Sequence, residues 1–222
     1  MNKAALRSKQ KNLRRILDYV IKNGEVSRVE IARAFGISTA TVTNLVTELI
    51  SQKLLYESRL KHASAGRKTT MLRFSADLCR IVTVFLSQKK AVDMAVCNLL
   101  GEPLVTKTVT LSLDITEERP EIVVLRDIIK AIKSFVESQP TDLYTSIAAI
   151  GVCVGGMVNI RQTIDMPQAN WKNVNLVAPL QAEMHMPVYF EGVTRMKAQY
   201  ELRYIEPEER NVIYLNLSTG IG

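Results

Sequence analysis

The first third of the chain repeats apolar residues at helical spacing in three stretches. The first spans residues 11–23, where apolar side chains recur at i, i+3, i+4, i+7 and i+8: Leu13, Ile16, Leu17, Val20 and Ile21. A shorter stretch over 28–35 is apolar at Ile31, Ala32 and Phe35. The third follows Ser38 and is apolar at Val42, Leu45, Val46, Leu49 and Ile50. This spacing predicts three amphipathic helices.

The second and third helices carry their own boundary signals. Ser27 is followed three residues later by Glu30, which is the spacing of a capping box. Gly36 is placed to end the second helix, and Ser38 is a natural N-cap for the third. Two short helices joined by a tight turn in this way form a helix-turn-helix.

The face of the third helix opposite its apolar stripe carries short side chains that form hydrogen bonds: Thr39, Thr41, Thr43, Asn44 and Thr47. Such a face suits the floor of a DNA major groove. We therefore predict DNA contacts at the N-terminal part of this helix, from Ser38, Thr39, Thr41, Thr43 and Asn44. The alternative is a helical hairpin whose threonine face is merely solvated.

Two extended segments follow, one beginning at 54–56 and one over 70–74, with a basic loop between them. Three helices and a hairpin predict a winged helix-turn-helix. Arg67 lies beside the permissive Gly66 and is placed to reach a narrow minor groove, with Lys68 next to it. The alternative for Arg67 and Lys68 is an ordinary solvated wing tip.

Charge divides the chain into two unlike parts. Residues 1–75 hold 15 Lys or Arg against 5 Asp or Glu, a formal charge of +10, whereas residues 76–222 hold 14 against 17, a charge of −3. These values sum to the net +7 of the whole chain. The basic excess therefore lies in the part with the helix-turn-helix, as expected for a surface that binds phosphate.

The remainder of the chain predicts an α/β unit. Residues 81–86, 91–98 and 103–109 read as a meander of three strands, followed by an amphipathic helix over 117–138. The apolar run 146–154 predicts a central strand covered on both faces, with Gly155 and Gly156 at its carboxyl end, where α/β sheets place ligands. The last predicted elements are a helix over 176–184, a strand over 187–190, a helix over 194–204 and a strand over 211–217.

Composition narrows the functional classes. No apolar run reaches the length of a membrane span, and the first residues lack the apolar stretch of a secretory signal. Cys79, Cys97 and Cys153 are scattered, as expected for core residues in a reducing cytoplasm. His62 and His185 are far apart. We therefore expect no metal site, no cofactor and no membrane association.

The order of these segments resembles one known family. A winged helix-turn-helix, a three-strand meander, and then IGVCVGGMV, ANWKNV, PVYFEG and NVIYLNLSTGIG are together similar to the ROK (repressor, open reading frame, kinase) family. The wing sequence SAGRK is similar to the Gly-Arg-Pro-like wing of its repressors, with Lys68 in place of proline. The resemblance implies sugar-responsive repressors or sugar kinases built on an actin-like, ribonuclease H-like fold. The DNA-reading part points to the repressor branch, since kinase members lack it.

The chain departs from the kinase pattern of that family at two places. Residues 86–90 (LSQKK) replace an Asp-x-Gly-x-Thr phosphate loop and hold neither the acid nor the glycines. Val193 in Glu191-Gly192-Val193 stands where a Glu-Asn-Asp motif has its catalytic Asp, and valine cannot accept a proton. The chain is therefore predicted not to be an enzyme.

The same departures weaken sugar binding, because a sugar is held by many hydrogen bonds. The residues left as candidate ligand contacts are Gly155, Gly156, Asn170 and Glu191. The alternative is that Asn170 and Glu191 are ordinary structural residues. The effector is accordingly a sugar, a sugar derivative, another small molecule or none.

The resemblance implies three domains. They are a winged helix-turn-helix over 1–75, the first actin-like lobe over 76–208 and an incomplete second lobe over 209–222. We expect the chain to be truncated from a longer protein, with the zinc-binding cluster of the family lying beyond Gly222.

The leading hypothesis is a cytoplasmic transcriptional repressor of carbohydrate uptake or catabolism genes, bound as a homodimer to a palindromic AT-rich operator on double-stranded DNA. The alternatives are a sugar kinase with an appended DNA-binding domain and a lobe that serves only as an interaction or dimerisation module.

Overall fold

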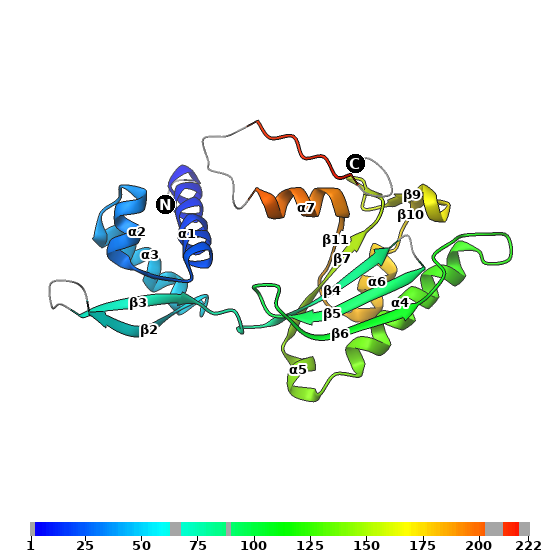
Figure 1. Ribbon diagram of the computed structural model, residues 1–222, viewed down its shortest axis with the longest axis horizontal. Helices are drawn as coiled ribbons and strands as arrows, with labels where there is room; N and C mark the ends of the chain where they lie inside the picture. The colour runs from blue at the N-terminus through cyan, green and yellow to red at the C-terminus, as the bar shows by residue number, and fades with distance from the viewer. Residues whose placement is uncertain (1–2, 63–67, 88–89, 203–210, 218–222) are drawn as a thin grey trace. The chain divides into compact units, whose positions relative to one another are not determined.

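The computed structural model describes residues 3–62, 68–87, 90–202 and 211–217. The chain forms two compact units, 1–78 and 79–222, which we call the N-terminal and C-terminal units (Figure 1). Each unit has its own apolar core.

The N-terminal unit has the predicted winged helix-turn-helix architecture. Its elements in chain order are α1 (Lys3–Asn23), β1 (Glu25–Ser27), α2 (Arg28–Phe35), α3 (Thr39–Ser51), β2 (Leu55–His62) and β3 (Lys68–Phe74). The strands form an antiparallel sheet in the order β1-β3-β2. Strand β1 was not predicted, because three residues are too few to show an alternating pattern. Helix α1 starts eight residues before the predicted 11–23, since residues 5–8 in its first turns are all exposed and continue no apolar stripe.

The core of this unit confirms the three apolar stripes. Ile16 and Val20 of α1, Ile31 of α2 and Val46 of α3 are fully buried, and Leu72 of β3 joins them. Beside this core, the Tyr19 and Phe35 rings meet edge to face at 5.4 Å between centroids. The Arg15 guanidinium lies 4.5 Å from the centre of the Phe35 ring. Helix α1 is thereby tied to α2 by an aromatic pair and a cation–π contact.

The C-terminal unit is built on a mixed sheet of five strands in the order β11-β7-β4-β5-β6. The meander β4 (Arg80–Ser87), β5 (Ala91–Cys97) and β6 (Pro103–Thr110) is antiparallel, whereas β7 (Ile147–Val154) and β11 (Val188–Gly192) run parallel to β4. This order is that of a ribonuclease H-like sheet, and it confirms the predicted three-strand meander.

Helices and a small sheet complete the C-terminal unit. The helices are α4 (Glu121–Glu137), α5 (Thr141–Thr145), α6 (Val177–Met184) and α7 (Val193–Glu201). The small antiparallel sheet β10-β9-β8 consists of β8 (Met157–Val158), β9 (Ile164–Met166) and β10 (Trp171–Val174), with the 3₁₀ turn Pro167–Ala169 between the last two. The strands of this small sheet are two to four residues long and were not predicted.

The prediction of a strand covered on both faces was wrong for β7. Ile150, Val152 and Val154 are buried against the core that includes α4 and α6, while Gly151 and Cys153 between them are only half-buried. The run looked uniformly apolar because its other face consists of Ala, Gly and Cys. Strand β7 is nevertheless central, with β11 on one side and β4 on the other.

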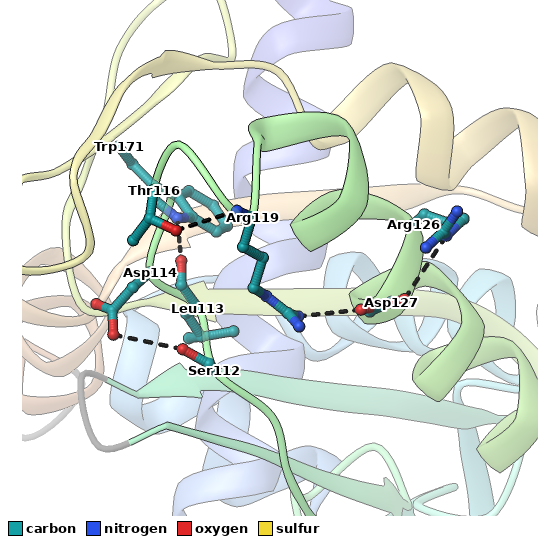
Figure 2. A network of polar contacts seen from close by, with 8 residues as sticks. All are labelled: Ser112, Leu113, Asp114, Thr116, Arg119, Arg126, Asp127 and Trp171. Carbon is teal, nitrogen blue, oxygen red and sulfur yellow. Dashed lines mark hydrogen bonds and ion pairs between the residues drawn. The ribbon is translucent and has the colours of Figure 1, made fainter.

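The segment 111–120 between β6 and α4 is held by polar contacts (Figure 2). The Trp171 indole N–H donates to the Leu113 carbonyl oxygen at 2.6 Å, and the Arg119 amide donates to Thr116 Oγ1 at 3.1 Å. The Arg119 guanidinium forms an ion pair with Asp127 at 3.0 Å. Pro120 N-caps α4, so the helix starts at Glu121 and not at the predicted residue 117.

The predicted strand over 211–217 was also wrong. These residues have no ladder apart from an isolated bridge at Leu217, and the Ile213 side chain is 88% exposed. A strand is stabilised by pairing, and no described strand pairs along this segment. Of the helices that the structure describes, none combines the length and apolarity needed to cross a bilayer. The described residues also contain no cluster of three His, Cys, Asp or Glu side chains suited to a metal ion.

Candidate nucleic-acid interface

The turn between α2 and α3 is set by the predicted caps. The Ser27 amide donates to Glu30 Oε2 at 2.6 Å and the Glu30 amide donates to Ser27 Oγ at 3.2 Å, which confirms the capping box. Gly36 ends α2 at φ +61°, a left-handed conformation that glycine adopts without strain. The Thr41 amide then donates to Ser38 Oγ at 3.1 Å, so Ser38 caps α3 as predicted.

Helix α3 separates its side chains into two faces. Its inner face is buried at Val42, Leu45, Val46 and Leu49. Its outer face is exposed at every polar position that was predicted to contact DNA: Ser38, Thr39, Thr41, Thr43 and Asn44. Ala40 and Thr47 are exposed on the same helix. The outer face is therefore open to solvent within the N-terminal unit.

Several hydroxyl groups on this face are already engaged within the helix. Ser38 Oγ and Thr41 Oγ1 share a hydrogen bond of 2.8 Å, and Thr43 Oγ1 donates to the Thr39 carbonyl oxygen at 2.8 Å. By contrast, the side chains of Asn44 and Thr47 make no hydrogen bond to any residue in the described part of the chain. The face thus combines engaged hydroxyls at Ser38, Thr41 and Thr43 with an unengaged amide at Asn44 and an unengaged hydroxyl at Thr47.

The acidic side chains of the N-terminal unit all have partners. Lys9 forms an ion pair with Glu48 of α3 at 2.6 Å, and Arg28 forms one with Glu57 of β2 at 2.8 Å. Glu30 belongs to the capping box, Ser58 Oγ donates to Glu25 at 2.8 Å, and Asp18 lies 3.9 Å from Arg14. The negative charge of this unit is therefore compensated locally.

Several cations of the same unit are left over. Five are exposed and form no ion pair with any described residue: Arg7, Lys11, Arg33, Lys53 and Arg73. Because the acids are already paired, these cations make the surface positive. A positive surface of this kind attracts phosphate.

The wing is the hairpin of β2 and β3, paired from Leu55 opposite Phe74 to His62 opposite Lys68. Its pairing shifts between Glu57 and Leu60. Lys68 is the first residue of β3, at the base of the connection between the strands. Arg67, the residue predicted to enter a minor groove, lies outside the described residues.

Three of the four candidate ligand residues lie at one edge of the large sheet. Gly155 and Gly156 follow β7, and Glu191 lies opposite Cys153 in the neighbouring parallel strand β11. The backbones are closely packed here, because a methyl group on Gly192 would lie 2.8 Å from the Gly156 carbonyl oxygen. A methyl group on Gly156 would lie 2.2 Å from the Asp165 carbonyl oxygen.

The polar candidates at this edge have internal partners. Glu191 Oε1 accepts from the Gly192 amide at 2.9 Å, and Glu191 Oε2 lies 3.4 Å from Arg195 Nη1. Asn170 is in the left-handed conformation at φ +58°, and its Nδ2 donates to the Ile115 carbonyl oxygen at 3.3 Å. Asn170 is thus attached to segment 111–120. Next to Glu191, burial raises the pKa of the Cys153 thiol to about 11, partly offset by Lys197.

One residue of the α3 face was missed by the sequence reasoning. Ala40 is exposed and lies four residues before Asn44 and seven before Thr47, so these side chains fall on one stripe of the helix. It was passed over because it is apolar. Its position in the helical repeat was the signal that could have found it.

A winged helix-turn-helix with an open polar recognition helix, joined to a ribonuclease H-like α/β unit, defines the class of this chain. Residues 9–55 match the model of the winged helix-turn-helix DNA-binding family, and residues 90–222 match the model of the ROK family. The second match spans more than half of the chain. The protein therefore belongs to the ROK family.

Known relatives agree with this assignment. The chain is 29% identical over 226 residues to the xylose repressor of Bacillus spizizenii, covering 96% of this chain and 54% of that protein. It is 25% identical to the xylose repressor of Caldicellulosiruptor bescii, covering 96% and 53%. The chain spans about half the length of the relatives it matches.

One solved structure shares the fold. It is a ROK family transcriptional regulator described as a homologue of the E. coli MLC protein, with a TM-score of 0.67 at 24% identity. The match covers 87% of this chain and 48% of that one. It supports the arrangement of a winged helix-turn-helix followed by an actin-like α/β unit.

Proposed function

We propose that the protein is a sequence-specific DNA-binding transcriptional regulator and not an enzyme. It acts in the cytoplasm as a homodimer and represses carbohydrate uptake or catabolism genes from a palindromic AT-rich operator. The observation that carries this proposal is the outer face of α3, which is exposed and polar on a unit with five exposed cations that form no ion pair with a described residue.

Each part of the N-terminal unit has a role in this proposal. Helix α3 enters the major groove with Ser38, Thr39, Thr41, Thr43 and Asn44 at the base edges. The wing residues Arg67 and Lys68 contact the adjacent minor groove. The surplus cations contact phosphates, which fixes the register of the protein on the duplex.

The C-terminal unit is proposed to sense a sugar or sugar derivative. Several relatives are named xylose repressors, which supports control of carbohydrate genes. The candidate contacts are Gly155, Gly156, Asn170 and Glu191, at and near the carboxyl edge of β7. Val193 follows Glu191 and Gly192 at the start of α7, and its apolar side chain offers no general base, which argues against the kinase alternative.

The test of DNA binding is a titration of the full chain against a duplex carrying the promoter region of a neighbouring sugar operon, at several salt concentrations. We expect affinity to fall steeply with salt and to exceed that for random duplex of equal length by at least about a thousandfold. Equal affinity for both duplexes, or affinity that does not change with salt, contradicts the proposal.

The test of sugar sensing is a thermal-shift screen with xylose, other pentoses and hexoses, and their phosphates. A bound effector at about 100 times its Kd stabilises the native state by about 2.7 kcal/mol. The control is Asn211→Ala, an exposed residue that is not among the candidate contacts. If no sugar shifts the unfolding temperature, the proposal of sugar sensing is contradicted. Turnover in a separate phosphorylation assay would support the kinase alternative.

A further inference from the structure

We propose that α3 reads A·T base pairs, with the Asn44 amide contacting adenine and the methyl groups of Ala40 and its threonine neighbours contacting thymine methyls. This inference rests on the proposed function, since it assumes that α3 lies in the major groove. It adds the residue that selects adenine and the side-chain methyl groups that contact thymine.

Helix α3 lacks the groups that read guanine best. Its sequence TATVTNLVTELIS contains no Lys or Arg, whereas an Arg or Lys bidentate to guanine is the commonest specific contact in the major groove. Its one acidic residue, Glu48, could accept from cytosine, but its carboxylate is held by Lys9 at 2.6 Å. The charged pairings that identify a G·C pair are therefore not available from this helix.

The side chains that face outward form one continuous stripe. Ala40, Thr43, Asn44 and Thr47 lie at i, i+3, i+4 and i+7, and all four are exposed. The stripe starts in the first turn of the helix, which is the part of a recognition helix that contacts base edges. It is a strip of short side chains, so the helix can approach the groove floor closely.

The hydrogen bonds within this face determine which chemical groups it presents to base edges. Thr43 donates its hydroxyl proton to the Thr39 carbonyl oxygen at 2.8 Å, so it can offer a base edge its methyl and an acceptor oxygen but no donor. Ser38 and Thr41 consume one proton between them. Ala40 contributes a methyl and nothing else. The stripe is therefore rich in methyl groups, which match the C5 methyl of thymine.

Asn44 is the exception within the stripe. Its amide carries an acceptor and two donors, and within the described chain it has no hydrogen-bond partner. An asparagine amide matches the N7 acceptor and N6 donor of adenine with two hydrogen bonds. No other side chain of the stripe offers both a donor N–H and an acceptor in one planar group, so Asn44 is assigned as the adenine-reading residue.

The experiment begins with a duplex selected from a random library by the full chain. Three versions are compared by equilibrium titration: the selected duplex, the same duplex with every thymine replaced by uracil, and one with 7-deazaadenine in place of adenine. Uracil removes only the methyl, and 7-deazaadenine removes only the N7 acceptor. We expect each replacement to weaken binding about tenfold or more, while affinity for random duplex changes by less than about twofold.

Variants assign the adenine contact to its residue. Asn44→Ala is expected to weaken binding to the selected duplex by about 5- to 100-fold and to make it insensitive to 7-deazaadenine. Asn211→Ala, an exposed asparagine of the C-terminal unit, is the matched control and should bind like the wild type. Circular dichroism confirms that both variants are folded.

The outcomes separate this inference from the proposed function. If no duplex is enriched over random DNA, the proposed function fails and this inference fails with it. If a duplex is enriched but binds equally with uracil, and Asn44→Ala keeps its base preference, the proposed function stands and this inference is overturned. Enrichment of a G·C-rich duplex also overturns it.

Discussion

The two candidate sites of this protein treat their polar side chains in opposite ways. On α3, Asn44 and Thr47 are exposed and make no hydrogen bond to any described residue. At the sheet edge of the C-terminal unit, Glu191 is bonded to the Gly192 amide and lies beside Arg195, and Asn170 is bonded to a backbone carbonyl. Both groups of residues were chosen from the sequence for the same reason, which was their polar chemistry in a suggestive place.

The difference shows which of the two sets of candidate residues the geometry favours for binding a ligand. A polar group that already has a partner must lose it before it can bind a ligand, and this loss offsets most of the gain. An exposed group without a partner has only its hydration to lose. Asn44 is therefore ready for a ligand as it stands. Glu191 and Asn170 at the sheet edge already have partners, as do the hydroxyls of Ser38, Thr41 and Thr43 on the α3 face.

Leu49→Ala is the largest predicted perturbation of the N-terminal unit. Leu49 lies on the inner face of α3 at 2% exposure, and we expect the variant to lose about 2–5 kcal/mol of stability through the cavity it leaves. Thr47→Ala, on the outer face of the same helix, should change stability by less than about 0.5 kcal/mol.

Urea unfolding separates the two units, because the only tryptophan, Trp171, lies in the C-terminal unit. Circular dichroism should report the loss in Leu49→Ala while the Trp171 fluorescence transition stays in place. If the fluorescence transition moves equally, the two units unfold together, which contradicts independent folding of their separate cores.

Gly156→Ala tests the close backbone packing at the sheet edge. The new methyl would lie 2.2 Å from the Asp165 carbonyl oxygen, so the strands must separate, and we expect a loss of about 1–3 kcal/mol or more in the Trp171 transition. The matched control is Gly151→Ala on β7, where no atom lies within 4 Å of the added methyl. Equal stability of the two variants contradicts the packing described here.

Ser27→Ala removes the N-cap of α2. The loss of the Glu30 amide bond to Ser27 Oγ should cost about 0.5–2 kcal/mol, measured as the shift of the circular dichroism transition in urea. Ser8→Ala, at an exposed position in α1, is the control and should be neutral. A neutral Ser27→Ala variant would show that the capping box contributes little.

Cys153→Ala should change how stability depends on pH. Burial raises the pKa of this thiol to about 11, so in the unfolded chain the proton leaves at lower pH than in the folded one. Stability is therefore lost as the pH rises from about 9 towards about 11. The variant should show a shallower alkaline decline in unfolding free energy by Trp171 fluorescence, and an identical slope in both proteins contradicts the assignment.

Elements that bury a stripe could be predicted from the sequence, and elements that depend on distant partners could not. The apolar stripes of α1, α2 and α3 identify both the helical period and the buried face of each helix. The caps at Ser27 and Ser38 locate the starts of α2 and α3. Strand β1 exists only because β3 pairs with it, and residues 211–217 lack such a partner among the described residues. Pairing of this kind leaves no local signal.

The candidate site was predictable to a similar extent. The phase of the apolar stripe is enough to predict that Thr43 and Asn44 point outward, and both are exposed. Which of them keeps a free hydrogen-bonding group depends on rotamers, as in the bond from Thr43 to Thr39, and no pattern of residue types contains that information. The hydrogen-bond partners of Glu191 and Asn170 could not be predicted either, because they also depend on side-chain rotamers.

Ser27 belongs to two elements at once, as the last residue of β1 and the N-cap of α2. In β1 it lies opposite Met71 of β3, the central strand, which also carries one side of the wing. The hairpin and the first helix of the pair are consequently joined through a single residue, with no linker between them. Under the proposed function this junction fixes where the wing starts relative to the helix pair, so we expect the protein to bind less tightly to a duplex whose groove widths do not match that spacing.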